Sequence, residues 1–237
     1  MNSLIFGTGE YVTGWTGQEG SRSDKSLGVV ALVHFDLRER GLIGDEIALC
    51  GTNGAKFDDI RRHFTDKIQF TNINNLHFQQ FPEVIFIELE GKSKLYVLQG
   101  SVVNREAYKD ALEKFAKPGD ICSVFTPDDT HFDIILAALD RGLHVMATKP
   151  MVKTLKEHQL LVEKAREKNV LLQIEVHKRF DPIYNDARMR IQKLGKFNFF
   201  TSYMSQPKFQ LETFKAWAGL GLFFTSISYL QSWCSRQ

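Results

Sequence analysis

The sequence contains few cysteines, and they lie far apart. The three cysteines, Cys50, Cys122 and Cys234, form no closely spaced pair among the 237 residues. Zinc sites and redox-active thiol pairs depend on close spacing, so the sequence predicts neither a metal site nor a redox motif. Cys50 and Cys122 lie in apolar segments, and we expect both to be buried, reduced thiols.

Long hydrophobic runs are also absent. No apolar segment approaches the about 20 residues that a helix needs to cross a bilayer, and residues 1–3 lead into an apolar segment without the basic start of a signal peptide. Charge of one sign is not concentrated either, because 30 basic and 28 acidic residues are spread along the chain and leave a net charge of +2. We therefore expect a cytoplasmic protein that binds neither a membrane nor nucleic acid.

Short apolar segments alternate with amphipathic segments of helical length. This alternation is typical of a parallel sheet with crossover helices, and it predicts an α/β fold with a doubly wound Rossmann sheet. The capping box Thr154-Leu-Lys-Glu157 and the pair Asp181-Pro182 each mark a helix start, and Asn169 marks a helix end. Strands are predicted at residues 4–6, 46–50, 121–125, 143–147 and 170–176, and helices at 27–40, 130–141, 154–168 and 182–195. Residues 14–26 are expected to form a polar loop, and residues 82–98 an inserted β-hairpin.

A glycine-rich turn follows the first predicted strand. It reads Gly7-Thr-Gly9-Glu-Tyr-Val-Thr-Gly14, which departs from the usual Gly-x-Gly-x-x-Gly spacing. As a bare pattern it fits an ordinary turn as well as a pyrophosphate-binding loop. Its place between a first strand and a first crossover favours the pyrophosphate, which backbone N–H groups would bind.

The end of the second predicted strand bears on cofactor choice. NAD-specific sites place an acidic residue here, whereas this strand is followed by Gly51, Thr52 and Asn53, with Lys56 just beyond. Neutral side chains would not repel a 2′-phosphate, and a lysine could pair with it, so NADP(H) is favoured over NAD(H). A simple Asn53-Gly54 turn is an alternative that is compatible with this interpretation.

Polar residues also follow two later strands. Thr126, Pro127 and His131 come after the third predicted strand, and Lys149-Pro150 comes after the fourth. Ligands bind at the carboxyl ends of strands in open α/β sheets. A desolvated lysine is a suitable general acid, so Lys149 is the leading catalytic candidate, although an isolated Lys-Pro pair is more often a surface feature.

These motifs resemble those of the glucose-fructose oxidoreductase/inositol dehydrogenase (Gfo/Idh/MocA) family. Thr-Pro-x-x-x-His at 126–131 and Thr-Lys-Pro at 148–150 are similar to its Thr-Pro-x-x-x-His and Glu-Lys-Pro signatures, and His-Lys-Arg-Phe-Asp-Pro at 177–182 is similar to its Arg-Arg-Phe-Asp-Pro segment. With residues 203–207 and 212–219 included, the sequence of these motifs most resembles that of fungal-type D-galacturonate reductases. The resemblance covers most of residues 4–219 apart from the predicted hairpin.

The resemblance implies roles for particular residues. Lys149 would contact both cofactor and substrate, and His177 would be a second catalytic residue. Thr148 replaces the usual Glu, so the resemblance supplies no carboxylate partner for Lys149. As alternatives to a substrate role, Tyr184 could be a packing residue, and Arg179 could serve solely to pair with Asp181. The implied cofactor residues are Gly7, Thr8, Gly9, Glu10, Tyr11 and Lys149, with Thr126, Pro127 and His131 on the nicotinamide side, and the implied substrate residues are His177, Arg179 and Tyr184. The end of the second strand adds Thr52, Asn53 and Lys56 to the expected cofactor residues.

The resemblance also divides the chain. Residues 1–176 would form the dinucleotide-binding domain, and residues 177–237 would begin a second α+β domain with a mostly antiparallel sheet, starting with a strand at 197–204. Since no histidine follows His177, we expect a truncated isoform or a disrupted gene model, with a naturally compact variant as the alternative. The expected activity is NADPH-dependent reduction of a sugar or uronic acid, with a non-catalytic dinucleotide-binding protein as the alternative. Homo-oligomer formation is a further expectation.

Overall fold

The fold is built around a parallel β-sheet. The computed structural model describes residues 1–17, 19–21, 25–68, 73–82, 103–196, 198–199, 201 and 203. In this part of the chain six strands pair in the order β3-β2-β1-β4-β5-β6, and each neighbouring pair is parallel. The order reverses between β1 and β4, which confirms the predicted doubly wound Rossmann sheet. The strands are β1 (Ser3–Phe6), β2 (Ile47–Cys50), β3 (Gln79–Phe81), β4 (Ile121–Val124), β5 (His144–Ala147) and β6 (Leu172–Ile174).

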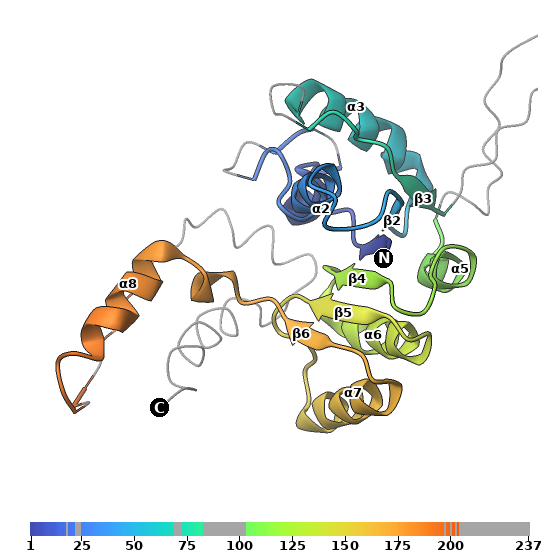
Figure 1. The fold of residues 1–237 in the computed structure, drawn as a ribbon. Coiled ribbons are helices and arrows are strands. Elements are labelled where there is room, and N and C mark those ends of the chain that lie inside the picture. The colour runs from blue at the N-terminus through green and yellow to red at the C-terminus, as the bar shows by residue number, and fades with distance from the viewer. Residues whose placement is uncertain are drawn as a thin grey trace, which may run out of the picture.

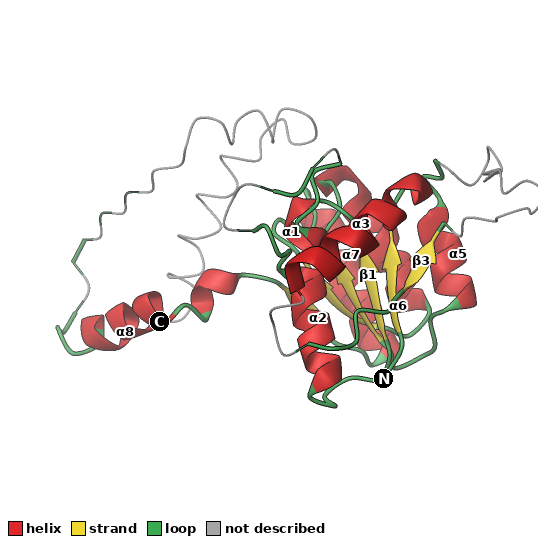
Figure 2. Cartoon of the chain, turned by 90° about the horizontal axis from the view of Figure 1, so that it is seen from above, coloured by secondary structure: helices red, strands yellow, loops and turns green. Residues whose placement is uncertain are grey.

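Helices cover both faces of the sheet (Figure 1; Figure 2). α2 and α3 contribute to a hydrophobic cluster on one face, and α5, α6 and α7 contribute to a cluster on the other. The α-helices are α1 (Glu10–Thr13), α2 (Val30–Glu39), α3 (Phe57–Ile68), α5 (Ala107–Lys114), α6 (His131–Asp140), α7 (Leu155–Lys168) and α8 (Pro182–Ile191), and short 3-10 turns occur at η1 (Gly54–Lys56), η2 (Asp128–Thr130) and η3 (His177–Arg179).

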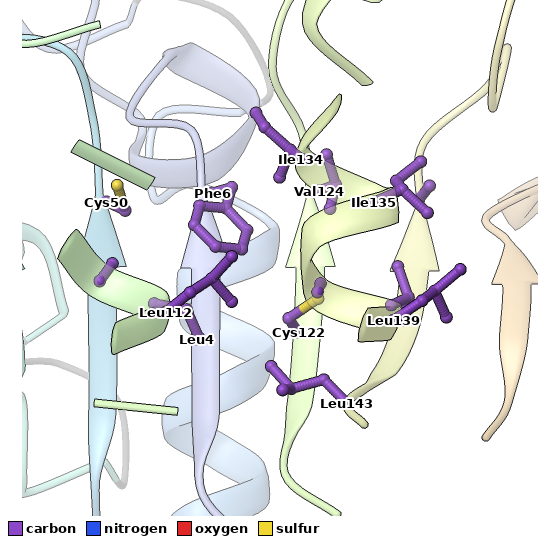
Figure 3. Packing of buried hydrophobic residues seen from close by; sticks show 14 of the residues in the cluster. Leu4, Phe6, Cys50, Leu112, Cys122, Val124, Ile134, Ile135, Leu139 and Leu143 are labelled. Atoms are coloured by element: carbon purple, nitrogen blue, oxygen red, sulfur yellow. The ribbon is translucent and has the colours of Figure 1, made fainter. Parts of the chain in front are cut away.

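The strands divide their side chains between the two clusters. Leu4 and Phe6 of β1 belong to the cluster under α5 and α6, whereas Ile5 belongs to the cluster under α2 and α3. Figure 3 shows the first of these clusters, with Leu112 of α5 and Ile135 of α6 among its members. Because both faces are covered, every residue of β1 is buried, which explains why the strand is almost entirely apolar in sequence.

Several predicted helix ends are confirmed. In α7 the Thr154 hydroxyl accepts from the Glu157 N–H at 3.2 Å, and the Glu157 carboxylate accepts from the Thr154 N–H at 3.2 Å. Asn169 ends this helix in the left-handed conformation, with φ of 53°. The Asp181 side chain caps α8, but α8 ends at Ile191 instead of near Gly195. No residue of α8 is buried, so no packing within the described chain supports a longer helix, and α8 extends away from the sheet (Figure 1; Figure 2).

Some observed elements were not predicted, and two predicted elements are not seen among the described residues. Helices α1, α3 and α5 and strand β3 were not anticipated. The predicted hairpin at 82–98 lies outside the described residues, apart from Pro82. Of the predicted strand at 197–204, residues 198, 199, 201 and 203 are described, and none of them is in a strand.

Cys50 and Cys122 are both buried free thiols, as predicted, and burial raises the pKa of Cys50 to about 12. Within the described ranges, no helix combines the length and apolar character needed to cross a bilayer. The same ranges contain no group of three or more His, Cys, Asp or Glu side chains placed to hold a metal ion.

Candidate functional site

The candidate residues gather at the carboxyl ends of the parallel strands. Gly7 follows β1, Gly51 follows β2, Phe125 follows β4, and Thr148 follows β5. β1 and β4 are adjacent, and they lie where the strand order reverses. Ligands bind in the crevice outside such a reversal point.

Gly7 occupies a position that no larger residue could take. Its φ is +115°, and a Cβ atom added to it would lie 2.2 Å from the carbonyl oxygen of Phe125. Its N–H donates to the Cys50 carbonyl at 2.8 Å. Glycine is therefore required for the ends of β1 and β4 to approach this closely.

Gly9 has a different role. It is the N-cap of α1 with φ of −80°, a value that other residues adopt, yet a Cβ atom added to it would meet nothing within 4 Å. The first N–H groups of a helix have no partner within the helix, and phosphate groups bind to them. The space beside Gly9 thus suits a group that approaches the backbone closely.

Gly14 explains the unusual spacing of the glycine motif. It is the C-cap of α1 with φ of 73°, and its N–H donates to the Glu10 carbonyl at 2.8 Å. A Cβ atom on Gly14 would lie 2.3 Å from the Ser26 carbonyl oxygen, and one on Gly28 would lie 2.6 Å from the Val12 carbonyl oxygen. Gly14 therefore serves the close packing of α1 against the segment that leads to α2.

The residues around Gly9 are engaged in protein contacts. A Cβ atom on Gly51 would lie 2.7 Å from the Thr8 hydroxyl oxygen, so Thr8 packs against the end of β2. The Tyr11 ring stacks on the Phe125 ring with centroids 5.7 Å apart. The Ser21 hydroxyl donates to the Glu10 carboxylate. These side chains support the turn through contacts within the protein.

The segment after β2 forms a capped turn. The Asn53 side chain accepts from the Ala55 N–H at 3.0 Å and begins η1, so the simple-turn interpretation of this segment is confirmed. Thr52 is exposed. The Lys56 ammonium lies beside the loop that follows α1, because a Cβ atom on Gly17 would be 3.7 Å from Lys56 Nζ.

Lys149 is half-buried at the end of β5. Burial lowers its pKa, while the carboxylates of Asp128 and Glu175 act in the opposite direction. Burial also raises the pKa of Asp128, and His131, Lys153 and Lys149 partly offset that effect. Asp128 and Glu175 therefore supply the negative charge that Thr148 cannot.

His131 is completely buried. Its Nε2 lies 2.8 Å from the Thr126 carbonyl oxygen, and its Nδ1 lies 2.9 Å from the Pro150 carbonyl oxygen and 3.2 Å from that of Met151. The ring thus lies between the loops that follow β4 and β5 and contacts the backbone of both. Thr126 and Pro127 remain nearer the surface, and the Thr130 and Thr126 hydroxyls are hydrogen-bonded at 2.8 Å.

The residues after β6 separate into two groups. His177 Nδ1 lies 3.1 Å from a carboxylate oxygen of Glu175, which links His177 to a carboxylate whose charge raises the pKa of Lys149. Arg179 and Tyr184 instead line a surface groove beside β6, and neither Lys149 nor His177 is among the described residues of its lining. Lys178 pairs with Asp181 at 3.0 Å, and its ammonium lies 5.1 Å from the centre of the Tyr184 ring.

Comparison with known proteins identifies the family. The family described as "Oxidoreductase family, NAD-binding Rossmann fold" (GFO_IDH_MocA) matches residues 45–176, more than half of the chain. The chain belongs to this oxidoreductase family. The match includes β2 to β6, Lys149 and His131, and begins after the glycine turn, so the assignment of that turn depends on its geometry.

Individual relatives match shorter stretches. The scyllo-inositol 2-dehydrogenase (NAD(+)) of Bacillus subtilis (strain 168) is 36% identical over 91 residues, which cover 37% of this chain and 27% of that protein. The scyllo-inositol 2-dehydrogenase (NADP(+)) IolW of the same organism is 28% identical over 98 residues, which cover 41% and 27%. The chain thus matches about a quarter of the length of these relatives. The structure of the probable oxidoreductase yhhX has the same fold, with a TM-score of 0.50 and 15% identity over 87% of this chain and 47% of the other.

Two residues that act on Lys149 were not predicted. Asp128 and Glu175 each follow a strand at the carboxyl edge of the sheet. The position of Asp128 after a predicted strand was an available signal, since polar residues at such ends converge on one edge. Glu175 carried no such signal, because it lies within the strand predicted at 170–176.

Proposed function

We propose that the protein transfers hydride between a nicotinamide dinucleotide, NADP(H) in preference to NAD(H), and a carbonyl or alcohol carbon of a sugar or sugar acid. The observation that carries this proposal is the position of Lys149. This half-buried lysine lies at the carboxyl edge of the sheet, the edge that also carries the glycine turn, and burial lowers its pKa. Membership of an NAD-binding oxidoreductase family supports it, as do relatives named as inositol dehydrogenases that use NAD(+) or NADP(+).

The glycine turn fits a dinucleotide, because a side chain at Gly9 would fill the space that a pyrophosphate needs. Backbone groups of residues 7–11 would hold the pyrophosphate, and Thr126 and Pro127 would lie on the nicotinamide side. When bound, the nicotinamide ring supplies or accepts the hydride. Thr52 and Asn53 present no carboxylate to a 2′-phosphate, and Lys56 presents a cation, which supports the preference for NADP(H).

Lys149 acts on the substrate oxygen. Its ammonium donates a hydrogen bond to the carbonyl oxygen and transfers a proton as negative charge develops there. Burial makes the ammonium a stronger acid, while Asp128 and Glu175 keep it from losing its proton too readily. His177, hydrogen-bonded to Glu175, is the second group that we propose to contact substrate.

A uronic acid related to D-galacturonate is the substrate that we propose within this class. The motifs at 126–131, 148–150 and 177–182 support it, and the guanidinium of Arg179 suits a carboxylate. We also propose that the dinucleotide-binding domain ends near residue 176 and that residues 177–237 belong to a substrate domain. The lack of buried residues in α8 supports that boundary.

The experiment is a turnover assay that follows the absorbance of the reduced nicotinamide. The purified chain is mixed with NADPH or NADH and with D-galacturonate, D-glucuronate, D-galactose or an inositol-derived ketone. We expect oxidation that depends on the uronic acid and is faster with NADPH. The proposal would be contradicted if neither NADPH nor NADH bound saturably.

A further inference from the structure

His131 differs from the other predicted site residues because its ring is buried and contacts the backbone of two loops that carry such residues. Its ring is completely buried, and three backbone carbonyl oxygens surround it. One of them, of Thr126, belongs to the loop after β4, and the others, of Pro150 and Met151, belong to the loop after β5. The ring therefore bridges two loops that carry different parts of the proposed site.

The bridge lies where the sheet itself no longer connects the two loops. β4 and β5 pair from Ile121 with His144 to Val124 with Ala147, and the Thr148 N–H then donates to the Val124 carbonyl at 3.0 Å. Beyond that bond Lys149 leads into Pro150, which has no N–H to donate. The imidazole ring presents a nitrogen to each side, and because carbonyl oxygens only accept, it hydrogen-bonds to both loops when both ring nitrogens carry a proton.

We propose that His131 is a positioning residue that fixes the loop carrying Lys149 against the loop carrying Thr126 and Pro127. This inference rests on the proposed function, in which Lys149 acts beside the nicotinamide. The Pro150 carbonyl, held by His131 Nδ1, is one residue from Lys149, so the ring limits how far the lysine backbone can move away from the β4 loop. Precise placement of a catalytic group is worth much of an enzyme's rate, and a displacement of about 1 Å can cost about 100-fold.

A purely structural role is the alternative, and His34 provides a matched control. His34 is also a buried histidine with both nitrogens engaged, at 2.6 Å from the Ser3 hydroxyl and 3.0 Å from the Ser123 hydroxyl. It lies on α2, and Ser3 is at the opposite end of β1 from the glycine turn. Loss of either ring removes buried hydrogen bonds, but only loss of His131 would uncouple the two loops.

The test compares His131→Asn, His131→Gln and His34→Gln with the unaltered chain. Asparagine can replace the bond on the Nδ1 side and glutamine the bond on the Nε2 side, but neither spans both loops. Each protein is measured for urea unfolding, for the Kd of NADPH, and for the rate at which an amine-directed acylating reagent modifies Lys149, read by mass spectrometry. Exposed Lys156 serves as the internal reference for reagent access.

For both His131 variants we expect the Kd of NADPH to rise about tenfold or more and the acylation rate of Lys149 to change by at least about threefold relative to Lys156. For His34→Gln we expect lower stability, with the Kd and the Lys149 rate within about twofold of the unaltered values, because His34 hydrogen-bonds to strand residues and not to either loop. Unchanged values in the His131 variants, or equal changes in His34→Gln, would overturn the proposal.

Two further arms keep the test decisive. If the unaltered chain does not bind NADPH, the proposed function fails, whereas the Lys149 acylation rate still tests the bridge. If the His131 variants do not fold, the assigned ring N–H signals of His131 in the unaltered, ¹⁵N-histidine-labelled protein decide. Slowly exchanging protons on both ring nitrogens support the bridge, whereas a proton on one nitrogen only, or rapid exchange with solvent, overturns it.

Discussion

Replacement of His34 by glutamine should remove a pH-dependent part of the stability of this protein. His34 is 3% exposed and bridges β1 and β4 through the hydroxyls of Ser3 and Ser123. Burial lowers its pKa from 6.5 to about 4. The unfolded chain therefore binds a proton at His34 between these values, whereas the folded protein does not.

The sign and size of the effect follow from this difference. The stabilisation is complete above about pH 6.5 and is lost as the pH falls toward 4, because protonation then favours the unfolded chain. The two pKa values correspond to about 3 kcal/mol of free energy of unfolding. Glutamine does not titrate, so this part of the pH dependence should disappear.

The assay is urea unfolding of both proteins at neutral pH and near pH 4.5. Between these conditions the unaltered protein should lose about 2 to 3 kcal/mol more than His34→Gln. His158→Gln, at an exposed position of α7, is the control and should match the unaltered protein. Parallel losses in the unaltered protein and His34→Gln would refute the assignment of this pH dependence to His34.

Two further predictions concern the site. Asn53→Asp should shift the ratio of the Kd values for NADPH and NADH toward NADH, because a carboxylate repels a 2′-phosphate and accepts from a ribose hydroxyl; an unchanged ratio in fluorescence titrations would count against this placement. Lys149→Met should abolish uronic acid turnover while it leaves the Kd of NADPH within about tenfold, because the ammonium acts mainly on the developing alkoxide, and retained turnover would remove Lys149 from the mechanism.

Local signals in the sequence predicted much of the sheet and several helix ends. The apolar runs of β1, β4 and β5 and the capping box of α7 are each contained in a few neighbouring residues. α3 also carried such a signal, because Phe57, Ile60, Phe64 and Ile68 lie on one buried face. β3 did not, since only Phe81 of its three residues is buried and the strand depends on pairing with β2.

The roles of site residues were less predictable, because contacts distant in sequence determine them. Gly14 was expected to be part of a phosphate-binding motif, yet its close neighbour is the Ser26 carbonyl. The contacts of His131 with carbonyl groups 19 and 20 residues along the chain could not be predicted from its neighbouring residues. The carboxylate partners of Lys149 come from Asp128 and Glu175, which the folded sheet brings to one edge.

The most direct test of dinucleotide binding at the strand ends is the affinity of Gly9→Val for NADPH. Gly9 has φ of −80°, and a Cβ atom added to it would meet nothing within 4 Å, so the valine variant should fold while its side chain fills the pyrophosphate position. We expect the unaltered chain to bind NADPH and the variant to bind about 100-fold more weakly or not at all, with little change in urea unfolding. Lys156→Val on α7 controls for the introduction of valine at an exposed position. Equal NADPH affinity in Gly9→Val and the unaltered chain would contradict a dinucleotide site at this turn.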